Sequence, residues 1–344
     1  MLDIPVAKLV EAEGECLLIN IEQITDYLSE NISDSVQQFI FIKEIEKKDS
    51  ASADYINAYE QLKKSKWYHQ LADEQWVDGS WGRFHTQDSK ALVKQKFVTT
   101  EVALRRAHEL GITKDDPLIA MCIELMENYI QGNKTWTDNI EKHKDNGKGH
   151  MFCRRFITAA RLNMFDSENP AIEPLRCVVV ETLKTAFATG CFDGSFWEKK
   201  VEEYYVPSIV APGSFYGSML LQNSKGMDDT LQRQWLDYIW HIKGGICYVS
   251  SVPPAEKQFL EDRQFEQWLS TLELLSGFSL FPNFMKDDVL QHLLNEAARL
   301  MNGDAVCNFK CYYADSYRDK NKYTTDCMLR IARTLVKCCG SDVH

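Results

Sequence analysis

Turn-forming residues are scarce in this sequence. It contains 17 glycines and 9 prolines among 344 residues, together about 8%, whereas globular proteins average about 12% for the two. An all-β or loop-rich fold needs more of them, because its turns rely on these residue types. Since 44% of the residues are hydrophobic, the chain can bury a large core, and the shortage of turn residues therefore predicts long helices.

Positive charge is also in short supply. Lys and Arg number 39 against 50 Asp and Glu, which gives a net charge of −11. A surface this acidic repels a phosphate backbone, and no basic stripe in the sequence offsets the repulsion. We therefore expect no nucleic-acid partner. An anionic membrane surface is disfavoured for the same reason.

Long hydrophobic runs are missing as well. No stretch reaches the ~18 consecutive apolar residues that a membrane-spanning helix needs. The N-terminal stretch MLDIPVAKLVEAEGE lacks the cationic start and the apolar run of a secretion signal. The 11 cysteines are an odd number, and most lie in apolar helical runs, as is typical of reduced thiols. We therefore expect a cytoplasmic chain without a transmembrane segment.

Metal and cofactor motifs are absent too. Cys307 and Cys311 form a C-x3-C pair, but no second pair of ligands follows at the spacing of a zinc site. His241 and Cys247 do not make up for it, since a lone histidine at a helix end is usually a capping group. No phosphate-cradling loop or thiol-ester motif occurs. We expect neither a metal nor a cofactor.

The hydrophobic pattern is helical along most of the chain, because apolar residues recur every three or four residues. The only strand-like run is short, at 246–249. The predicted helices are 19–30, 33–47, 52–72, 96–110, 116–131, 150–164, 171–188, 212–224, 228–243, 256–276, 285–302 and 324–339.

Glycine-bearing turns follow every second predicted helix. The intervals between them are 53, 62, 51 and 58 residues, counted between Gly79, Gly132, Gly194, Gly245 and Gly303. This spacing indicates a drifting repeat of two helices. The second helix of each pair opens on residues that favour helix N-termini, at Asp115-Asp116-Pro117, Asn169-Pro170, Asp228-Asp229 and Asp287-Asp288.

Successive helical hairpins either stack as an open solenoid or close into a ring of inner and outer helices. Five hairpins lie between about 33 and 302, and the remaining helices at 19–30 and 324–339 can pair to close the ring. The last helix is apolar over much of its surface, unlike the polar cap of a solenoid. We predict an all-α fold, an (α/α) toroid of about six hairpins. The toroid domain would span 51–344, with 1–50 as an N-terminal helical arm that packs on the ring or closes it.

One motif carries a family resemblance. The segment Gln75-Trp76-Val77-Asp78-Gly79-Ser80-Trp81 resembles the QW repeat, Q-x3-G-x-W, of the terpenoid cyclases and protein prenyltransferases. The specific match covers about 67–110, including the threonine-bearing helix start at Thr99-Thr100. The resemblance implies an (α/α) toroid that binds an apolar, isoprenoid-like molecule in a central cavity, with cyclisation as its chemistry if it is an enzyme. Gln75 and Trp81 themselves suit structural roles between helix ends.

The chemistry of that family is only partly represented. Its proton-initiated cyclases use an Asp-x-Asp-Asp motif, and the nearest match here begins with Gly226 instead of Asp and continues to Asp228-Asp229. Because similar Asp pairs recur once per repeat, we expect Asp228 to cap a helix, and it is retained as a candidate catalytic acid. The prenyltransferases hold a zinc ion partly through a histidine, and the comparable position in this chain is Thr324. We therefore expect no catalytic zinc.

If a ring has a functional lumen, the starts of its inner helices form the mouth. Glu101 and Asp326 occupy equivalent positions in their repeats and are the other two catalytic candidates. A helix N-terminus lowers a carboxyl pKa, which suits a base or a cation stabiliser rather than an acid. The substrate-binding candidates are His150, Arg154, Tyr216, Asp262 and Tyr312.

Two other functions stay open. A toroid that has lost catalysis would act as a binding or scaffold protein. Toroids also host carbohydrate lyases and hydrolases, which need paired carboxylates or a Tyr/His/Arg set across a groove. The loop with Tyr312, Tyr313, Asp315 and Tyr317 suits a sugar. An aromatic-lined cavity with a buried acid would favour the cyclase-like function.

Overall fold

A computed structural model of the chain describes residues 20–86, 94–136, 147–204, 207–309 and 311–339. This part of the chain is all-helical and contains no strand, so the predicted fold class is confirmed at that level. The predicted strand-like run contributes one isolated bridge, in which Cys247 pairs with Ser214. Residues 1–19 of the predicted N-terminal arm lie outside the described residues.

The helices of the first half largely match their predicted positions. The predicted helix at 52–72 is divided at Ser65, whose hydroxyl accepts from the Tyr68 amide and starts a new helix. The one at 33–47 ends in a short π-helical segment, η1. The elements are α1 (Ile21–Asn31), α2 (Ser35–Ile40), η1 (Phe41–Ile45), α3 (Ala53–Lys63), α4 (Lys66–Glu74), α5 (Thr100–Glu109), α6 (Pro117–Gln131) and α7 (Gly147–Asn163).

The second half departs further from the prediction. Two helices, α9 and α10, occupy a region where no helix was predicted. The first of them forms because Asp193 starts a helix rather than a turn, by accepting from the Ser195 and Phe196 amides. The elements are α8 (Glu173–Ala186), α9 (Gly194–Tyr204), α10 (Pro207–Val210), α11 (Phe215–Leu221), α12 (Asp229–Trp240), α13 (Phe265–Leu275), η2 (Phe281–Asn283), α14 (Lys286–Met301) and α15 (Lys320–Cys339).

Predicted helix caps are confirmed at two of the four positions. Asp116 caps α6 by accepting from the Leu118 amide at 2.9 Å, and Asp228 caps α12 through the Leu231 amide at 2.9 Å. Asn169 instead accepts from the amide of residue 171, before α8 begins. Asp287 lies inside α14, which starts one residue earlier, so the capping prediction is wrong there.

The QW-like segment joins helix ends, as its residue types predicted. The Gln75 amide donates to the carbonyls of Gly79 at 3.0 Å and Leu118 at 2.8 Å, linking the end of α4 to the start of α6. Trp81 is fully buried and donates to the Leu71 carbonyl at 2.7 Å. Gly79 has a φ of 87°, and a Cβ there would lie 2.7 Å from the Met121 carbonyl oxygen, so only glycine fits.

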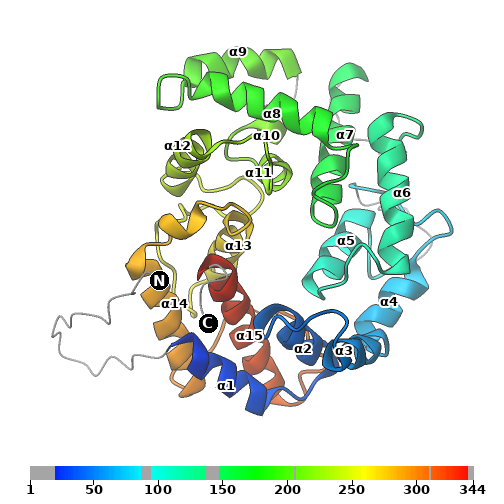
Figure 1. Cartoon of the computed structure of the whole chain (residues 1–344), viewed down its shortest axis with the longest axis vertical. Helices are drawn as coiled ribbons and strands as arrows, with labels where there is room; N and C mark the ends of the chain where they lie inside the picture. Colours follow the sequence, from blue (N-terminus) through cyan, green and yellow to red (C-terminus); the bar gives the residue numbers. More distant parts are fainter. Residues whose placement is uncertain (1–19, 87–93, 137–146, 205–206, 310, 340–344) are drawn as a thin grey trace.

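The two ends of the described chain meet. Helix α15 packs against α1, α2 and η1, as well as against α13 and α14. Its residues from Thr325 to Leu335 are all buried, which explains why the last helix is so apolar. In Figure 1 the helices follow one another around the view, from α1 through α6 and α8 to α14 and α15.

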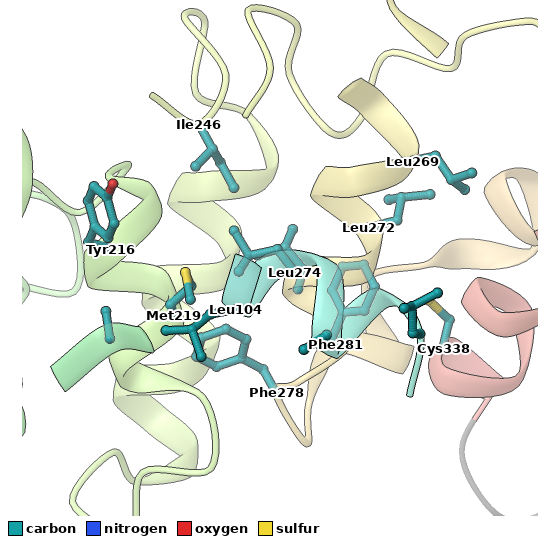
Figure 2. Packing of buried hydrophobic residues seen from close by; sticks show 14 of the residues in the cluster. Leu104, Tyr216, Met219, Ile246, Leu269, Leu272, Leu274, Phe278, Phe281 and Cys338 are labelled. Atoms are coloured by element: carbon teal, nitrogen blue, oxygen red, sulfur yellow. The ribbon is translucent and has the colours of Figure 1, made fainter. Parts of the chain in front are cut away.

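One large hydrophobic core runs through the described residues. Its largest members include Trp81, Trp235 and Trp268, and the indole N–H of each donates to a backbone carbonyl. Figure 2 shows part of this core, with side chains contributed by α5, α11, α13 and α15. Phe278 and Phe281 are both buried in it.

Candidate functional site

Two of the predicted site residues meet in a buried polar cluster. Glu101 lies in the first turn of α5, as predicted, and Tyr216 lies in the first turn of α11. The Tyr216 hydroxyl donates to Glu101 Oε1 at 3.0 Å. Arg161 of α7 donates to the same oxygen at 2.7 Å, and His85 Nδ1 bonds the other oxygen. We call His85, Glu101, Arg161 and Tyr216 the Glu101 cluster.

Sequence reasoning missed His85 and Arg161. His85 follows the QW-like turn, and Arg161 sits in an otherwise apolar stretch of α7. An arginine within an apolar run is a signal that a buried carboxylate lies opposite, but the sequence alone does not identify which one. Three helices and one loop converge only in the folded chain.

The charges in the Glu101 cluster are fixed by their neighbours. Burial alone would raise the pKa of Glu101, but Arg161 and His85 outweigh it and hold that pKa below its usual range. Burial and the adjacent carboxylate raise the pKa of the Tyr216 hydroxyl. The cluster therefore contains an ionised Glu101 and a protonated Tyr216. The pKa is lowered as predicted, but Arg161 and His85 lower it, whereas the prediction relied on the helix N-terminus.

The cluster reaches the molecular surface on one side. The side chain of His85 is 33% exposed, whereas those of Glu101 and Arg161 are almost fully buried. The ring of Tyr248 lies 6.4 Å from that of Tyr216 and is largely exposed. Tyr248 has a φ of 69°, a left-handed backbone conformation that is unfavourable for a residue of its size.

Asp326 does not have the environment predicted for it. Helix α15 begins at Lys320, so Asp326 lies in the second turn, beyond the reach of the helix dipole. The prediction of a lowered pKa is therefore wrong: burial raises the pKa of Asp326 to about 6. Its carboxylate accepts from the Tyr313 and Ala314 amides, from the Gln37 side chain and from the Tyr317 hydroxyl. These bonds hold the 313–317 segment against α2 and α15.

The other candidates are dispersed. Asp228 is engaged as the cap of α12, and Asp262 is an exposed residue whose carboxylate accepts from the Phe259 amide. Tyr312 is 48% exposed on the 311–317 loop. Arg154 is partly buried on α7. His150 lies in α7, but its side chain is outside the described part.

Most side chains of the loop that was predicted to suit a sugar make structural contacts instead. Tyr313 is buried, and its hydroxyl accepts from Arg333 at 2.7 Å. Tyr317 donates to Asp326. Only Tyr312 offers an exposed ring from this loop, so the loop does not present the row of aromatic rings that a sugar would contact.

A pocket of about 500 Å³ opens elsewhere, between η1, α5, α7 and α15. It lies at the C-terminal ends of α5, α7 and α15, whereas the sequence predicted a mouth at the starts of the inner helices. None of the eight predicted site residues lines it. We call it the lysine pocket. It is lined by Lys43, Glu44, Lys47, His108, Gly111, Ile112, Thr113, Met164, Phe165, Val336 and Lys337.

Positive charge dominates the lysine pocket. Arg333 forms two hydrogen bonds of 2.8 Å with Glu44, and Lys337 lies 3.5 Å from the same carboxylate. Although burial opposes it, these cations lower the pKa of Glu44 to about 2. Glu44 thus offsets the charge of Arg333. The amines of Lys47 and Lys337 then remain as the excess charge of the pocket.

The rest of the pocket wall is apolar or neutral. Met164, Phe165 and Val336 are partly exposed to it. His108 packs edge-on against Phe165, with ring centroids 5.9 Å apart. Burial, together with the charge of Lys337, lowers the pKa of His108, so this imidazole is neutral at physiological pH. The pocket therefore combines amines with an apolar surface.

The two sites are connected through one side chain. Arg161 donates from Nη1 to the sulfur of Met164 at 3.5 Å and from Nε to Glu101. Met164 lines the lysine pocket. Met164 therefore contacts the Glu101 cluster and also forms part of the lysine pocket.

No group of His, Cys, Asp and Glu in the described part of the chain is arranged to hold a metal ion. Within the same residues, no helix combines the length and the hydrophobicity needed to cross a membrane. Comparison with known proteins gives no match to a family model, to a curated protein or to a solved structure.

Proposed function

We propose that this chain is an (α/α) toroid that binds a small amphiphilic anion in the lysine pocket. The isoprenoid diphosphates are the ligand class that the QW-like resemblance suggests. The observation that carries the proposal is the pocket itself: a volume of about 500 Å³ with three lysines beside an apolar wall. Small-molecule sites commonly have about 300–1,000 Å³.

Helix contacts support the toroid. Helix α7 packs on α11, α11 on α13 and α13 on α15, so the first helices of successive pairs contact one another in series. The contacts of α15 with α1, α2 and η1 bring the two ends of this series together. A ring with an inner and an outer layer of helices needs both kinds of contact.

The charge of the pocket supports an anionic ligand. The chain as a whole carries −11, yet the pocket presents Lys47 and Lys337 beside Arg333 and against the one carboxylate of Glu44. Ammonium groups bind phosphate oxygens as point charges, and a low-dielectric wall strengthens the attraction. Met164, Phe165 and Val336 would contact an apolar tail. The sequence predicted an apolar, isoprenoid-like ligand, and the lysines argue for an anionic head on it.

Binding is better supported than cyclisation. An alkene is protonated only by a carboxylic acid that keeps its proton and faces the substrate. Asp228 caps a helix, and Glu101 is ionised. Asp326 has a raised pKa but accepts hydrogen bonds from four groups and does not line the pocket.

Calorimetry with three probes tests the proposal. Farnesyl diphosphate should bind more tightly than inorganic diphosphate, and farnesol more weakly than either, because only the first uses both charge and apolar wall. The Lys47→Gln/Lys337→Gln double variant should lose about tenfold or more in affinity for farnesyl diphosphate, that is about 1.4 kcal/mol.

The matched control is Lys64→Gln/Lys243→Gln, which removes two exposed lysines outside the pocket. It should bind as the wild type does. If neither diphosphate binds, the proposal is wrong and the scaffold alternative gains support. If both double variants lose affinity equally, the binding does not use the pocket.

The Glu101 cluster favours a second candidate function, carbohydrate cleavage. It assembles a tyrosine, a histidine and an arginine around one carboxylate, and the exposed Tyr248 lies beside Tyr216. Because Tyr216 keeps its proton, its role in such a reaction would be that of an acid rather than a base. On a panel of acidic polysaccharides, an active protein should lose about 100-fold or more in rate on Tyr216→Phe, as for a general acid. Tyr238→Phe is the control, and an inactive wild type rejects this candidate.

A further inference from the structure

Lys43 stands apart from the other lysines of the pocket. It is partly buried on η1, and its amine donates to the Gly111 carbonyl. No carboxylate in the described chain forms an ion pair with it, whereas Lys337 pairs with Glu44. Its stem passes close to Gly111, where a Cβ would lie 3.5 Å from Lys43 Cδ. The amine is therefore held in place at the pocket wall.

The charged groups around Lys43 disfavour a positive charge on its own amine. Arg333 and Lys337 face it from α15, and the adjacent Glu44 is engaged by both. The remaining charged or titratable groups of the pocket are Lys47, after η1, and the neutral His108 of α5. Burial lowers the pKa of Lys43, and the two cations on α15 lower it further against the opposing effect of Glu44. A desolvated amine beside cations is a stronger nucleophile, because more of it is neutral.

We propose that Lys43 is a nucleophilic amine that forms an imine with anionic carbonyl compounds, aldehydes or keto acids, that enter the lysine pocket. The inference rests on the proposed function in one respect: Lys47 and Lys337 attract the anionic part of the ligand. It adds a covalent reaction to a site so far described only as a binding site.

The reaction needs no oxidant or reductant. The nitrogen lone pair attacks the carbonyl carbon, a C–N bond forms and the C=O electron pair moves to oxygen. One proton passes from nitrogen to that oxygen to give a carbinolamine. The C–O bond then breaks, the second amine proton leaves nitrogen, and the oxygen departs as water. The products are the imine and one water molecule.

Pyridoxal 5′-phosphate, which carries both an aldehyde and a phosphate, is a suitable probe. The full chain is incubated with it near neutral pH, reduced with borohydride and mapped by peptide mass spectrometry. Lys43 should be labelled several-fold faster than Lys47 or Lys337, because its lowered pKa leaves more of its amine neutral. Lys43→Met should lose this label and keep the circular dichroism of the wild type. Labelling of Lys47 and Lys337 with an unmodified Lys43 would overturn the inference.

A second pair of probes separates this inference from the proposed function. Benzaldehyde has no charge, and inorganic diphosphate competes only for the anion site. If diphosphate slows pyridoxal phosphate labelling of Lys43 but not benzaldehyde labelling, both proposals are supported. If both aldehydes label Lys43 and diphosphate has no effect, the nucleophile stands and the anion site is wrong. If diphosphate binds but neither aldehyde labels Lys43, the nucleophile is wrong and the anion site stands.

Discussion

At the scale of single residues, the environment of a carboxyl group separates the two inner-helix candidates. Glu101 and Asp326 occupy equivalent sequence positions, yet one is bound by an arginine and the other by neutral donors. A cationic partner stabilises the charged form, whereas burial without one favours the protonated form. Two carboxyl groups at equivalent sequence positions thus have opposite pKa shifts.

Asp326 should give the folded state a distinct pH dependence. Its pKa rises from 3.8 to about 6 on folding, so the folded chain binds this proton more tightly than the unfolded chain does. The stability that Asp326 contributes is therefore complete below pH 4 and is lost as pH rises from about 4 to about 6, by about 3 kcal/mol.

Urea unfolding of the wild type and of Asp326→Asn measures this at a series of pH values. Asparagine does not titrate, so the difference between the two free energies of unfolding isolates Asp326. The free energy of unfolding of the wild type should fall relative to that of the variant as pH rises from 4 to 6. A constant difference, or one of opposite slope, contradicts the assigned environment.

At the scale of helices and turns, short-range chemistry accounts for most boundaries. Asp116 and Asp228 start helices because their carboxylates satisfy backbone amides that no helical carbonyl can reach. Ser65 divides one predicted helix for the same reason. The periodicity of apolar residues missed that break, since α3 and α4 both bury one side.

The cap at Asp228 separates a structural from a catalytic role. Asp228→Ala should lower the free energy of unfolding by about 1 kcal/mol, because the Leu231 amide loses its acceptor. Asp228→Asn should stay close to the wild type, since asparagine is an equally good cap. Chemical denaturation checks both, with Asp229→Ala as the control. An activity that Asp228→Asn abolishes without loss of stability would instead make Asp228 a catalytic residue.

At the scale of the whole molecule, the contact between the first and last helices is the decisive feature. Helix α1 packs on α14 and α15, although about 300 residues separate them along the chain. If this contact closes a ring, a defect in α1 should spread to the C-terminal helices. An open arrangement would confine the damage to the N-terminal end.

Leu28→Ala tests closure. Leu28 is fully buried on α1, and truncation should cost about 2–5 kcal/mol. Hydrogen exchange followed by mass spectrometry should show faster exchange in α14 and α15 as well as in α1. Leu62→Ala on α3, equally buried, is the control and should act first on α2 to α4. Unchanged exchange in α14 and α15 of the Leu28 variant would argue against a closed ring.

The sequence by itself determined the all-α class, the caps at Asp116 and Asp228, and the structural use of Gln75 and Trp81. The caps depend on interactions between residues close in sequence. The roles of Gln75 and Trp81 follow from the hydrogen-bonding groups that their side chains carry. It also predicted that Glu101 and Tyr216 lie near the starts of their helices, where the structure has both.

Only the tertiary structure decided which groups meet. Arg161 joins Glu101 from another helix, and Lys43, Lys337 and His108 converge on the pocket from three separate elements. Helical periodicity indicates which side of a helix is buried, but it carries no information on which distant side chain lies opposite. The lysines resembled ordinary surface residues in the sequence. Their proximity in space gives the pocket its excess of cations, and burial among these cations lowers the pKa of Lys43.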